Sequence, residues 1–280
     1  MSDSMLRLGY NTNGFYCHSL QSALEIISQL GYDCVAITLD HQALNPWQQD
    51  LDVELEHVAT ILSACSLSCV IETGARFLLD PWYKHEPTLI SSSYDGRKLR
   101  LDFLKKAVDI ALRLKAEAVS FWSGKKPDSV NDETAWKWLT SACRELAIYA
   151  EERSVCLAFE PEPGMFLETL SQYYELKQRV TSHQIGLTLD LGHVFLTEET
   201  SVGACIRHLK DDIHNIHIED MKRGIHEHLF FGEGEMDFSE IVQTLKDIDY
   251  GGPINVELSR HSHDAVMTAR KAKEFLVKLM

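Results

Sequence analysis

Short apolar runs alternate with longer stretches of helical periodicity along the whole chain, and this alternation limits the fold more than any other feature of the sequence. The runs are rich in β-branched and aromatic residues, as the buried strands of parallel sheets are. We expect eight strands, at residues 6–11, 34–39, 68–72, 118–122, 156–160, 185–190, 213–218 and 254–257. Apolar residues on one helical face predict eight helices, at residues 19–30, 51–63, 97–114, 132–153, 167–180, 202–209, 238–248 and 264–279.

Eight strand-then-helix units in succession predict a (β/α)₈ TIM barrel that forms a single domain over residues 1–280. An open doubly wound sheet is the alternative, but its phosphate-binding loop requires GxGxxG after the first strand, and residues 9–14 read GYNTNG. The longest irregular connection, residues 74–94, follows the third strand at the end of the barrel where active sites form. Such a connection is typical of a lid or a binding loop.

Charge and composition exclude several kinds of partner. The formal net charge of −15 argues against nucleic acid, because phosphate backbones are held mainly by lysine and arginine. The seven cysteines are odd in number and mostly lie in apolar runs, which indicates buried free thiols. The N-terminus has no apolar signal core, and no run reaches the roughly 18 apolar residues of a membrane span. We therefore expect a cytoplasmic protein without a membrane partner.

Four successive predicted strands end on side chains that are poorly placed for packing but suited to a metal ion. LAFE ends at Glu160, LTLD at Asp190 and INVE at Glu257, and IHNIHIED places His217 near the end of the seventh strand. In a barrel these strand ends point to one face, where the carboxylates would repel one another. A divalent cation removes that repulsion, and three carboxylates with one imidazole suit Mn²⁺, Mg²⁺, Co²⁺ or Zn²⁺. The sequence therefore predicts a divalent metal site at the C-terminal face of the barrel.

Five segments of the chain resemble the xylose isomerase-like TIM barrels, which include sugar and sugar-phosphate isomerases and epimerases, inosose dehydratases and endonuclease IV. The segments are LAFEPEPG (157–164), LTLDLGH (187–193), IHNIHIED (213–220), FGEGEMDF (231–238) and INVEL (254–258). The resemblance implies that Glu160, Asp190, His217 and Glu257 are the four metal ligands. It also implies that Glu160 and Glu257 act as an acid/base pair, which removes and returns a proton α to a carbonyl through a metal-stabilised enediolate.

Three further histidines leave two interpretations open. His193 follows Asp190 by three residues, and His226 and His228 lie in a loop after the seventh strand. The resemblance to the nuclease, which carries an Asp-x-His pair at this spacing, implies a second metal ion at these histidines. The other interpretation is that the imidazoles hydrogen-bond a polyhydroxyl or phosphorylated substrate. A third possibility is that they are ordinary loop histidines without a functional role.

Other side chains near the expected face are candidates for contact with a substrate. Glu72 and Trp122 end the third and fourth predicted strands, Arg76 lies in the irregular connection, and Glu162 is the second acid of EPEPG. Arg76 suits a phosphate or carboxylate group, although a surface or structural salt bridge is the favoured interpretation. Trp122 suits the C–H face of a sugar, and packing in the hydrophobic core is the alternative interpretation.

The sequence therefore predicts a metal-dependent isomerase or epimerase that acts on a sugar, a keto-sugar or a cyclic polyol. A dehydratase or lyase on a keto-sugar or inosose would use the same metal and base, and the sequence does not separate the two. A nuclease of the endonuclease IV type is disfavoured by the charge of −15 and by the third and fourth strand ends, which lack that family's histidines. A non-catalytic sugar-binding barrel is the remaining alternative. Family analogy also suggests a homo-oligomer.

Overall fold

Eight parallel strands close into a barrel in the computed structural model, which describes residues 6–280. Neighbouring strands follow chain order, and the first strand pairs with the last, with Leu8 opposite Ile254. All eight predicted strands are present, so the predicted TIM-barrel fold is confirmed. Their bounds are β1 (Arg7–Asn11), β2 (Cys34–Thr38), β3 (Ser68–Glu72), β4 (Val119–Phe121), β5 (Leu157–Phe159), β6 (Ile185–Asp190), β7 (Ile213–Ile218) and β10 (Pro253–Val256).

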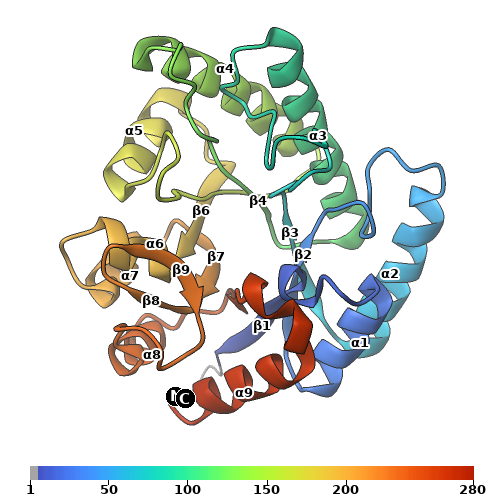
Figure 1. The fold of residues 1–280 in the computed structure, drawn as a ribbon, viewed down its shortest axis with the longest axis vertical. Helices are drawn as coiled ribbons and strands as arrows, with labels where there is room; N and C mark the ends of the chain where they lie inside the picture. Colours follow the sequence, from blue (N-terminus) through green and yellow to red (C-terminus); the bar gives the residue numbers. More distant parts are fainter. Residues whose placement is uncertain (1–5) are drawn as a thin grey trace.

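The helices surround the strands as an outer ring (Figure 1). The eight that the periodicity predicts are α1 (Leu20–Gln29), α2 (Leu51–Cys65), α3 (Tyr94–Leu114), α4 (Asp132–Glu151), α5 (Leu170–Val180), α7 (Val202–Leu209), α8 (Phe238–Asp247) and α9 (Ala265–Val277). In α1 the predicted apolar face is buried at Leu20, Ala23, Leu24 and Ile27. Each fully buried leucine or isoleucine of this kind stabilises the fold by roughly 1.5–3 kcal/mol.

A polar network fills the barrel interior beneath its C-terminal end. Asn255 donates to Asn215 Oδ1 at 2.9 Å, and Thr188 donates to Ser120 Oγ at 3.0 Å. These four side chains are at most 1% exposed. Gly9 leaves room for the network, because a Cβ there would lie 2.1 Å from Asn255 Oδ1. The network links the strands that carry the predicted site.

The segment after β6 and the segment after β7 contain structure that the sequence pattern did not predict. A short helix, α6 (Leu191–Thr197), begins directly after β6 and places His193 in its first turn. Residues expected as a loop after β7 form an antiparallel hairpin of β8 (Asp220–Lys222) and β9 (Ile225–Leu229). Because side chains alternate along a strand, His226 and His228 project from the same side of β9.

Three predicted strand ends lie just outside the strands themselves. Trp122, Glu160 and Glu257 each follow the last residue of β4, β5 or β10. The backbone is nevertheless held there, since Glu160 N donates to Phe121 O at 2.8 Å and Glu257 N donates to Ile218 O at 3.1 Å. The two glutamates therefore start from fixed backbone positions.

The connection from residue 74 to 93 is irregular, as predicted, and precedes α3. Ala75, Arg76 and His85 in this connection have positive φ angles of 55°, 22° and 69°. Non-glycine residues rarely adopt such angles, and where they do they often lie near ligand sites.

Within residues 6–280, all seven cysteines are free, and four of them are buried, which agrees with the predicted buried thiols for Cys34, Cys69, Cys143 and Cys205. The prediction is wrong for Cys17, which is exposed, and Cys65 and Cys156 are only half-buried. Over the same residues, none of the helices has the length and apolar character needed to cross a membrane.

Candidate active site

A cavity of about 570 Å³ opens at the C-terminal end of the barrel. Its volume lies within the range of about 300–1,000 Å³ that is usual for small-molecule sites. Residues at or just after the ends of seven of the eight barrel strands line it, together with residues of α6, β9, the connection after β3 and the segments after β1 and β10. The lining residues are Asn11, Asn13, Tyr16, Thr38, Glu72, Thr73, Gly74, Arg76, Lys84, His85, Trp122, Glu160, Glu162, His193, His217, His228, Glu257, Ser259, Arg260 and Ser262.

The four predicted metal ligands meet at this cavity. One ligand atom from each of Glu160, Asp190, His217 and Glu257 lies within 4.8 Å of the other three. His217 Nδ1 is at the centre, 2.9 Å from Glu257 Oε2 and 3.1 Å from Glu160 Oε1. Asp190 Oδ2 is 3.9 Å from the same nitrogen. The geometry therefore brings together three carboxylates and one imidazole from four successive barrel strands.

The electrostatics of this group indicate a place for positive charge. Burial raises the pKa of Glu160 well above its usual range, and the Glu257 and Asp190 carboxylates raise it further. Burial lowers the pKa of His217, but the surrounding carboxylates raise it well above its ordinary value overall. Burial also opposes ionisation of Glu257, yet the pKa of Glu257 is lowered because His217 and Asn13 stabilise its carboxylate. Without a metal, a protonated His217 supplies the positive charge that the acids require.

Asp190 provides an independent test of whether these residues fit a metal ion. Its Oδ1 accepts a hydrogen bond from His193 N at 2.8 Å and so caps α6. Its Oδ2 is buried and has no hydrogen-bond partner within residues 6–280. Buried carboxylate oxygens are normally paired, so an orphaned oxygen beside two glutamates and a histidine fits a cation. The four residues thus fit a divalent ion.

Glu72 holds His217 from the opposite side. Glu72 Oε1 accepts from His217 Nε2 at 2.9 Å and from Asn215 Nδ2 at 3.1 Å. A carboxylate that accepts the second ring N–H of a metal-binding histidine fixes the tautomer and leaves the other nitrogen for the ion. Glu72 therefore orients the His217 ring, and its side chain also lines the cavity.

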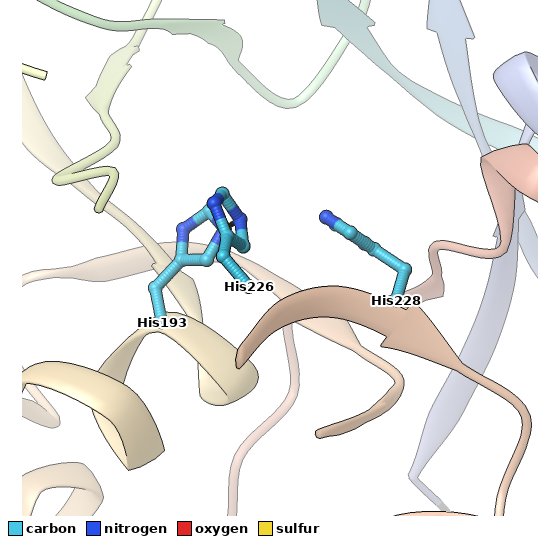
Figure 2. A group of neighbouring side chains, drawn as sticks. All are labelled: His193, His226 and His228. Carbon is cyan, nitrogen blue, oxygen red and sulfur yellow. Dashed lines mark hydrogen bonds between the residues drawn. The ribbon is translucent and has the colours of Figure 1, made fainter. Parts of the chain in front are cut away.

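The three further histidines lie together (Figure 2), and two of them, His193 and His228, line the cavity. His193 Nε2 is 3.0 Å from His226 Nε2, and the ring centroids of His193 and His228 are 6.0 Å apart. One nitrogen from each ring lies within 4.8 Å of the other two. Burial lowers the pKa of His193 to about 4, and burial also lowers the pKa of His226. His193 is therefore uncharged at neutral pH.

The remaining predicted substrate residues also face the cavity. Burial, together with Glu257 and Asp190, raises the pKa of Glu162 to about 8. Trp122 is 6% exposed and lies between two partners, with His85 edge-on at 5.6 Å and the Arg100 guanidinium 4.9 Å from its ring centroid. Arg76 donates to Asn13 O at 3.1 Å and lies 4.0 Å from Asp40.

The comparison with known proteins decides the family. Residues 24–279 match the family described as Xylose isomerase-like TIM barrel. The chain belongs to this family. Its eight-stranded barrel and its strand-end acids agree with the resemblance of the five segments in the C-terminal half.

Several relatives of this xylose isomerase-like barrel are distant. An uncharacterised protein from Methanocaldococcus jannaschii is 26% identical over 64% of this chain, and the chain spans only 63% of that protein's length. L-ribulose-5-phosphate 3-epimerase UlaE from Escherichia coli is 24% identical, over 90% of this chain and 87% of the enzyme. The structure of D-allulose 3-epimerase from Methylomonas sp. in complex with D-allulose has a TM-score of 0.76 at 21% identity, and covers 98% of this chain and 97% of that one. At that identity, the structural likeness supports the fold alone.

Some residues of the site in this xylose isomerase-like barrel were not among the predicted site residues. Asn13 donates to Glu257 Oε1 at 2.7 Å, although the two are 244 residues apart. Glu219 is fully buried, accepts from Gly192 N at 3.1 Å and has an unpaired Oε2 among the described side chains. The sequence did contain a signal for Glu219. It follows His217 by two residues, so in an extended chain the two side chains are expected on the same face. For Asn13, which lies in a short 3-10 helix (Thr12–Phe15), and for Lys84 and His85, which lie in the connection after β3, the sequence offered none.

Proposed function

We propose that this xylose isomerase-like barrel is a divalent-metal-dependent epimerase or isomerase of a sugar, keto-sugar or cyclic polyol. The observation that carries the proposal is the convergence of Glu160 and Glu257 on His217 in a cavity of small-molecule size. The names of similar proteins, among them L-ribulose-5-phosphate 3-epimerase and D-allulose 3-epimerase, support this class of reaction.

In this proposal the two glutamates exchange a proton with the carbon next to a carbonyl group. One carboxylate removes the proton from one face of that carbon, and the protonated form of the other returns a proton to the opposite face. Two separate carboxyl groups are what inversion of a stereocentre requires, because a single base would return the proton to the face it came from. When bound, a divalent ion supplies Lewis-acid stabilisation of the negative charge that develops beside the carbonyl.

Other side chains have supporting roles. Asn13, through its bond to Glu257 Oε1, holds one oxygen of that carboxylate so that the other faces the centre of the group. Glu72 keeps the His217 ring in place. Trp122 and Glu162 line the cavity beside the acids and are proposed to contact the substrate through its C–H face and its hydroxyl groups.

Arg76 is proposed to bind an anionic or polar end of the substrate. It lines the cavity with Lys84 and Arg260, so three cations border a cavity whose floor is acidic. The Arg76 guanidinium has five N–H donors. It donates one hydrogen bond to Asn13 O, lies 4.0 Å from Asp40 and stacks over the Tyr16 ring at 4.6 Å, which leaves donors for a ligand.

The test uses Glu160→Gln and Glu257→Gln variants of the metal-loaded protein with a panel of keto-sugars in D₂O. The wild type is expected to incorporate deuterium at the carbon next to the carbonyl without losing a group. Each variant is expected to lose at least about 10³-fold in kcat, because glutamine can neither accept nor deliver the proton. Loss of water or another β-substituent by the wild type would assign a lyase instead, and full activity in either variant would contradict the two-glutamate proton transfer.

A further inference from the structure

A second, smaller pocket of about 40 Å³, called the side pocket below, lies between the segment after β1 and the segment after β2. Four of its residues also line the main cavity, namely Asn13, Tyr16, Thr38 and Arg76. The side pocket therefore adjoins the site of the two proposed proton-transfer glutamates. The Arg76 guanidinium lies 4.6 Å from the Tyr16 ring centroid, so this stacked pair stands at the boundary between the two spaces.

Polar groups around the side pocket have unused hydrogen-bonding capacity. Asn13 Oδ1 and His18 Nδ1 are buried, and neither has a hydrogen-bond partner within residues 6–280. Asp40 Oδ2 lies 4.0 Å from Arg76 Nη1, which is too long for a hydrogen bond. Buried polar atoms are normally paired, so unpaired atoms on residues that line one small pocket indicate that a polar group binds there.

The volume of the side pocket limits the size of that group. A water-sized group needs roughly 10–15 Å³ of such space, so the pocket holds two or three non-hydrogen atoms. A hydroxymethyl group, with one carbon and one oxygen, fits this volume. A phosphate ester, with a phosphorus and four oxygens, does not.

Charge and hydrogen-bond direction also favour a neutral hydroxyl group. Asn13 Oδ1 and the buried Asp40 carboxylate only accept hydrogen bonds, and Arg76 only donates them. A hydroxyl group both donates and accepts, so it can satisfy both kinds of partner. A phosphate group offers acceptor oxygens and negative charge, which Asp40 repels. Arg260, at the edge of the main cavity, is already paired with Glu227 Oε1 at 2.9 Å.

Asn13 connects the side pocket to the proposed chemistry. Its Nδ2 donates to Glu257 Oε1 at 2.7 Å, while its Oδ1 remains unpaired. A group in the side pocket is therefore separated from Glu257 by a single side chain. One end of a small sugar can occupy the side pocket while the carbon next to its carbonyl lies beside the glutamates.

We propose that the side pocket binds the terminal hydroxymethyl group of an unphosphorylated keto-sugar, at the end remote from the carbonyl. The hydroxyl donates to an acceptor of the lining, Asn13 Oδ1 or Asp40, and accepts from Arg76. This inference rests on the proposed function and narrows its substrate class to sugars that carry no phosphate at that end.

Isothermal titration calorimetry of the metal-loaded, full-length protein tests this inference by binding alone. The probes are D-allulose, D-tagatose and D-fructose, each compared with its 6-deoxy and 6-phosphate derivatives. For the ketohexose that binds most tightly, we expect the 6-deoxy derivative to bind about 10-fold more weakly, because the buried polar groups stay unpaired. The 6-phosphate is expected to bind at least about 10-fold more weakly, because it meets Asp40 and exceeds the pocket volume.

An Ala43→Leu variant fills the side pocket, because Ala43 is one of its half-buried lining residues. The variant is expected to bind the ketohexose about 10-fold more weakly than the wild type and to bind the ketohexose and its 6-deoxy derivative equally well. Ala142→Leu is the matched control, since Ala142 is half-buried on α4 and lines neither space. It should keep the wild-type order of affinities. Circular dichroism checks that both variants are folded.

Several outcomes would overturn the inference. They are equal binding of a ketohexose and its 6-deoxy derivative by the wild type, tighter binding of the 6-phosphate, no measurable binding of any of the three ketohexoses, and retained preference for the 6-hydroxyl in a folded Ala43→Leu variant. Failure of the proposed function is a separate result, because it would appear as the expected order of affinities without proton exchange in D₂O.

Discussion

At the scale of single residues, Glu72 orients His217, one of the four proposed metal ligands, without belonging to that group. Its Oε1 accepts the His217 Nε2 proton, and Asn215 donates to the same oxygen. This chain of contacts continues to Asn255 inside the barrel, so the ring orientation is tied to buried residues of β7 and β10. The sequence interpretation made Glu72 a substrate residue, and the hydrogen bonds add a positioning role.

We expect Glu72→Gln to weaken binding of Mn²⁺ about 10–100-fold, because the uncharged amide is a poorer acceptor for the His217 N–H. Titration of the metal-free variant with Mn²⁺, followed by electron paramagnetic resonance of the free ion, measures this change. Excess Mn²⁺ should restore occupancy of the site. Unchanged affinity would mean that Glu72 does not position His217.

His85 gives a prediction about pH. Burial lowers the pKa of His85 from 6.5 to about 4. Its Nδ1 faces Gly74 O at 2.6 Å, within the connection after β3. As the pH falls from 6.5 toward 4, the unfolded chain binds a proton that the folded chain does not bind, so His85 makes folding less stable over that range by up to about 3 kcal/mol.

The His85→Gln variant removes this proton uptake while keeping a polar side chain near Gly74 O. Its free energy of unfolding should therefore fall less than that of the wild type between pH 6.5 and pH 4.5. Urea denaturation at several pH values measures both proteins. Parallel stability curves for the two proteins over this range would show that His85 titrates normally.

At the scale of elements, Asp220 fixes the segment that carries His226 and His228. This buried carboxylate accepts four backbone N–H groups, from Met221, Gly232, Gly234 and Met236, at 2.8–3.2 Å. The bonds tie the start of β8 to the loop that follows β9. These four hydrogen bonds hold the hairpin of β8 and β9 in a fixed position, although it carries exposed polar residues.

We expect Asp220→Asn to lower the free energy of unfolding by roughly 2–4 kcal/mol. The reason is that the asparagine Nδ2 group is a donor, so backbone N–H groups that now bond to a carboxylate oxygen would lose their acceptor. Urea denaturation measures the loss. An Asp237→Asn variant is a matched control, since Asp237 is an exposed helix cap that accepts only Glu240 N. Equal losses in the two variants would contradict the special role of Asp220.

The elements also show what the sequence pattern predicts and what it does not. All eight strands and their following helices emerge from periodicity, because burial on both sides makes parallel strands continuously apolar. The same reasoning did not predict the hairpin of β8 and β9, because its strands are short and rich in charged residues and histidine. Periodicity did not predict the helix α6 either, because α6 is short and begins directly after β6 without a loop.

At the scale of the whole molecule, closure of the barrel assembles the site. Asn13 follows β1 and Glu257 follows β10, and only the pairing of these first and last strands brings them to 2.7 Å. The convergence of the four proposed ligands was predictable because each lies at or next to the end of an apolar strand in a repeating architecture. The positions of Asn13, His85 and Lys84 were not, because short 3-10 turns and irregular connections are placed by tertiary contacts that have no period in the sequence. The predicted homo-oligomer and cytoplasmic location stay predictions.

Binding of Mn²⁺ by the wild type and by Asp190→Asn tests the central claim most directly. Asparagine keeps the oxygen that caps α6 but replaces the unpaired charged oxygen of the carboxylate. We predict one Mn²⁺ per wild-type chain, at least about 100-fold weaker binding by Asp190→Asn, and unchanged binding by the Asp237→Asn control. A wild type that takes up no divalent ion, or an Asp190→Asn variant that binds Mn²⁺ as tightly as the wild type, would contradict a metal site built from Glu160, Asp190, His217 and Glu257.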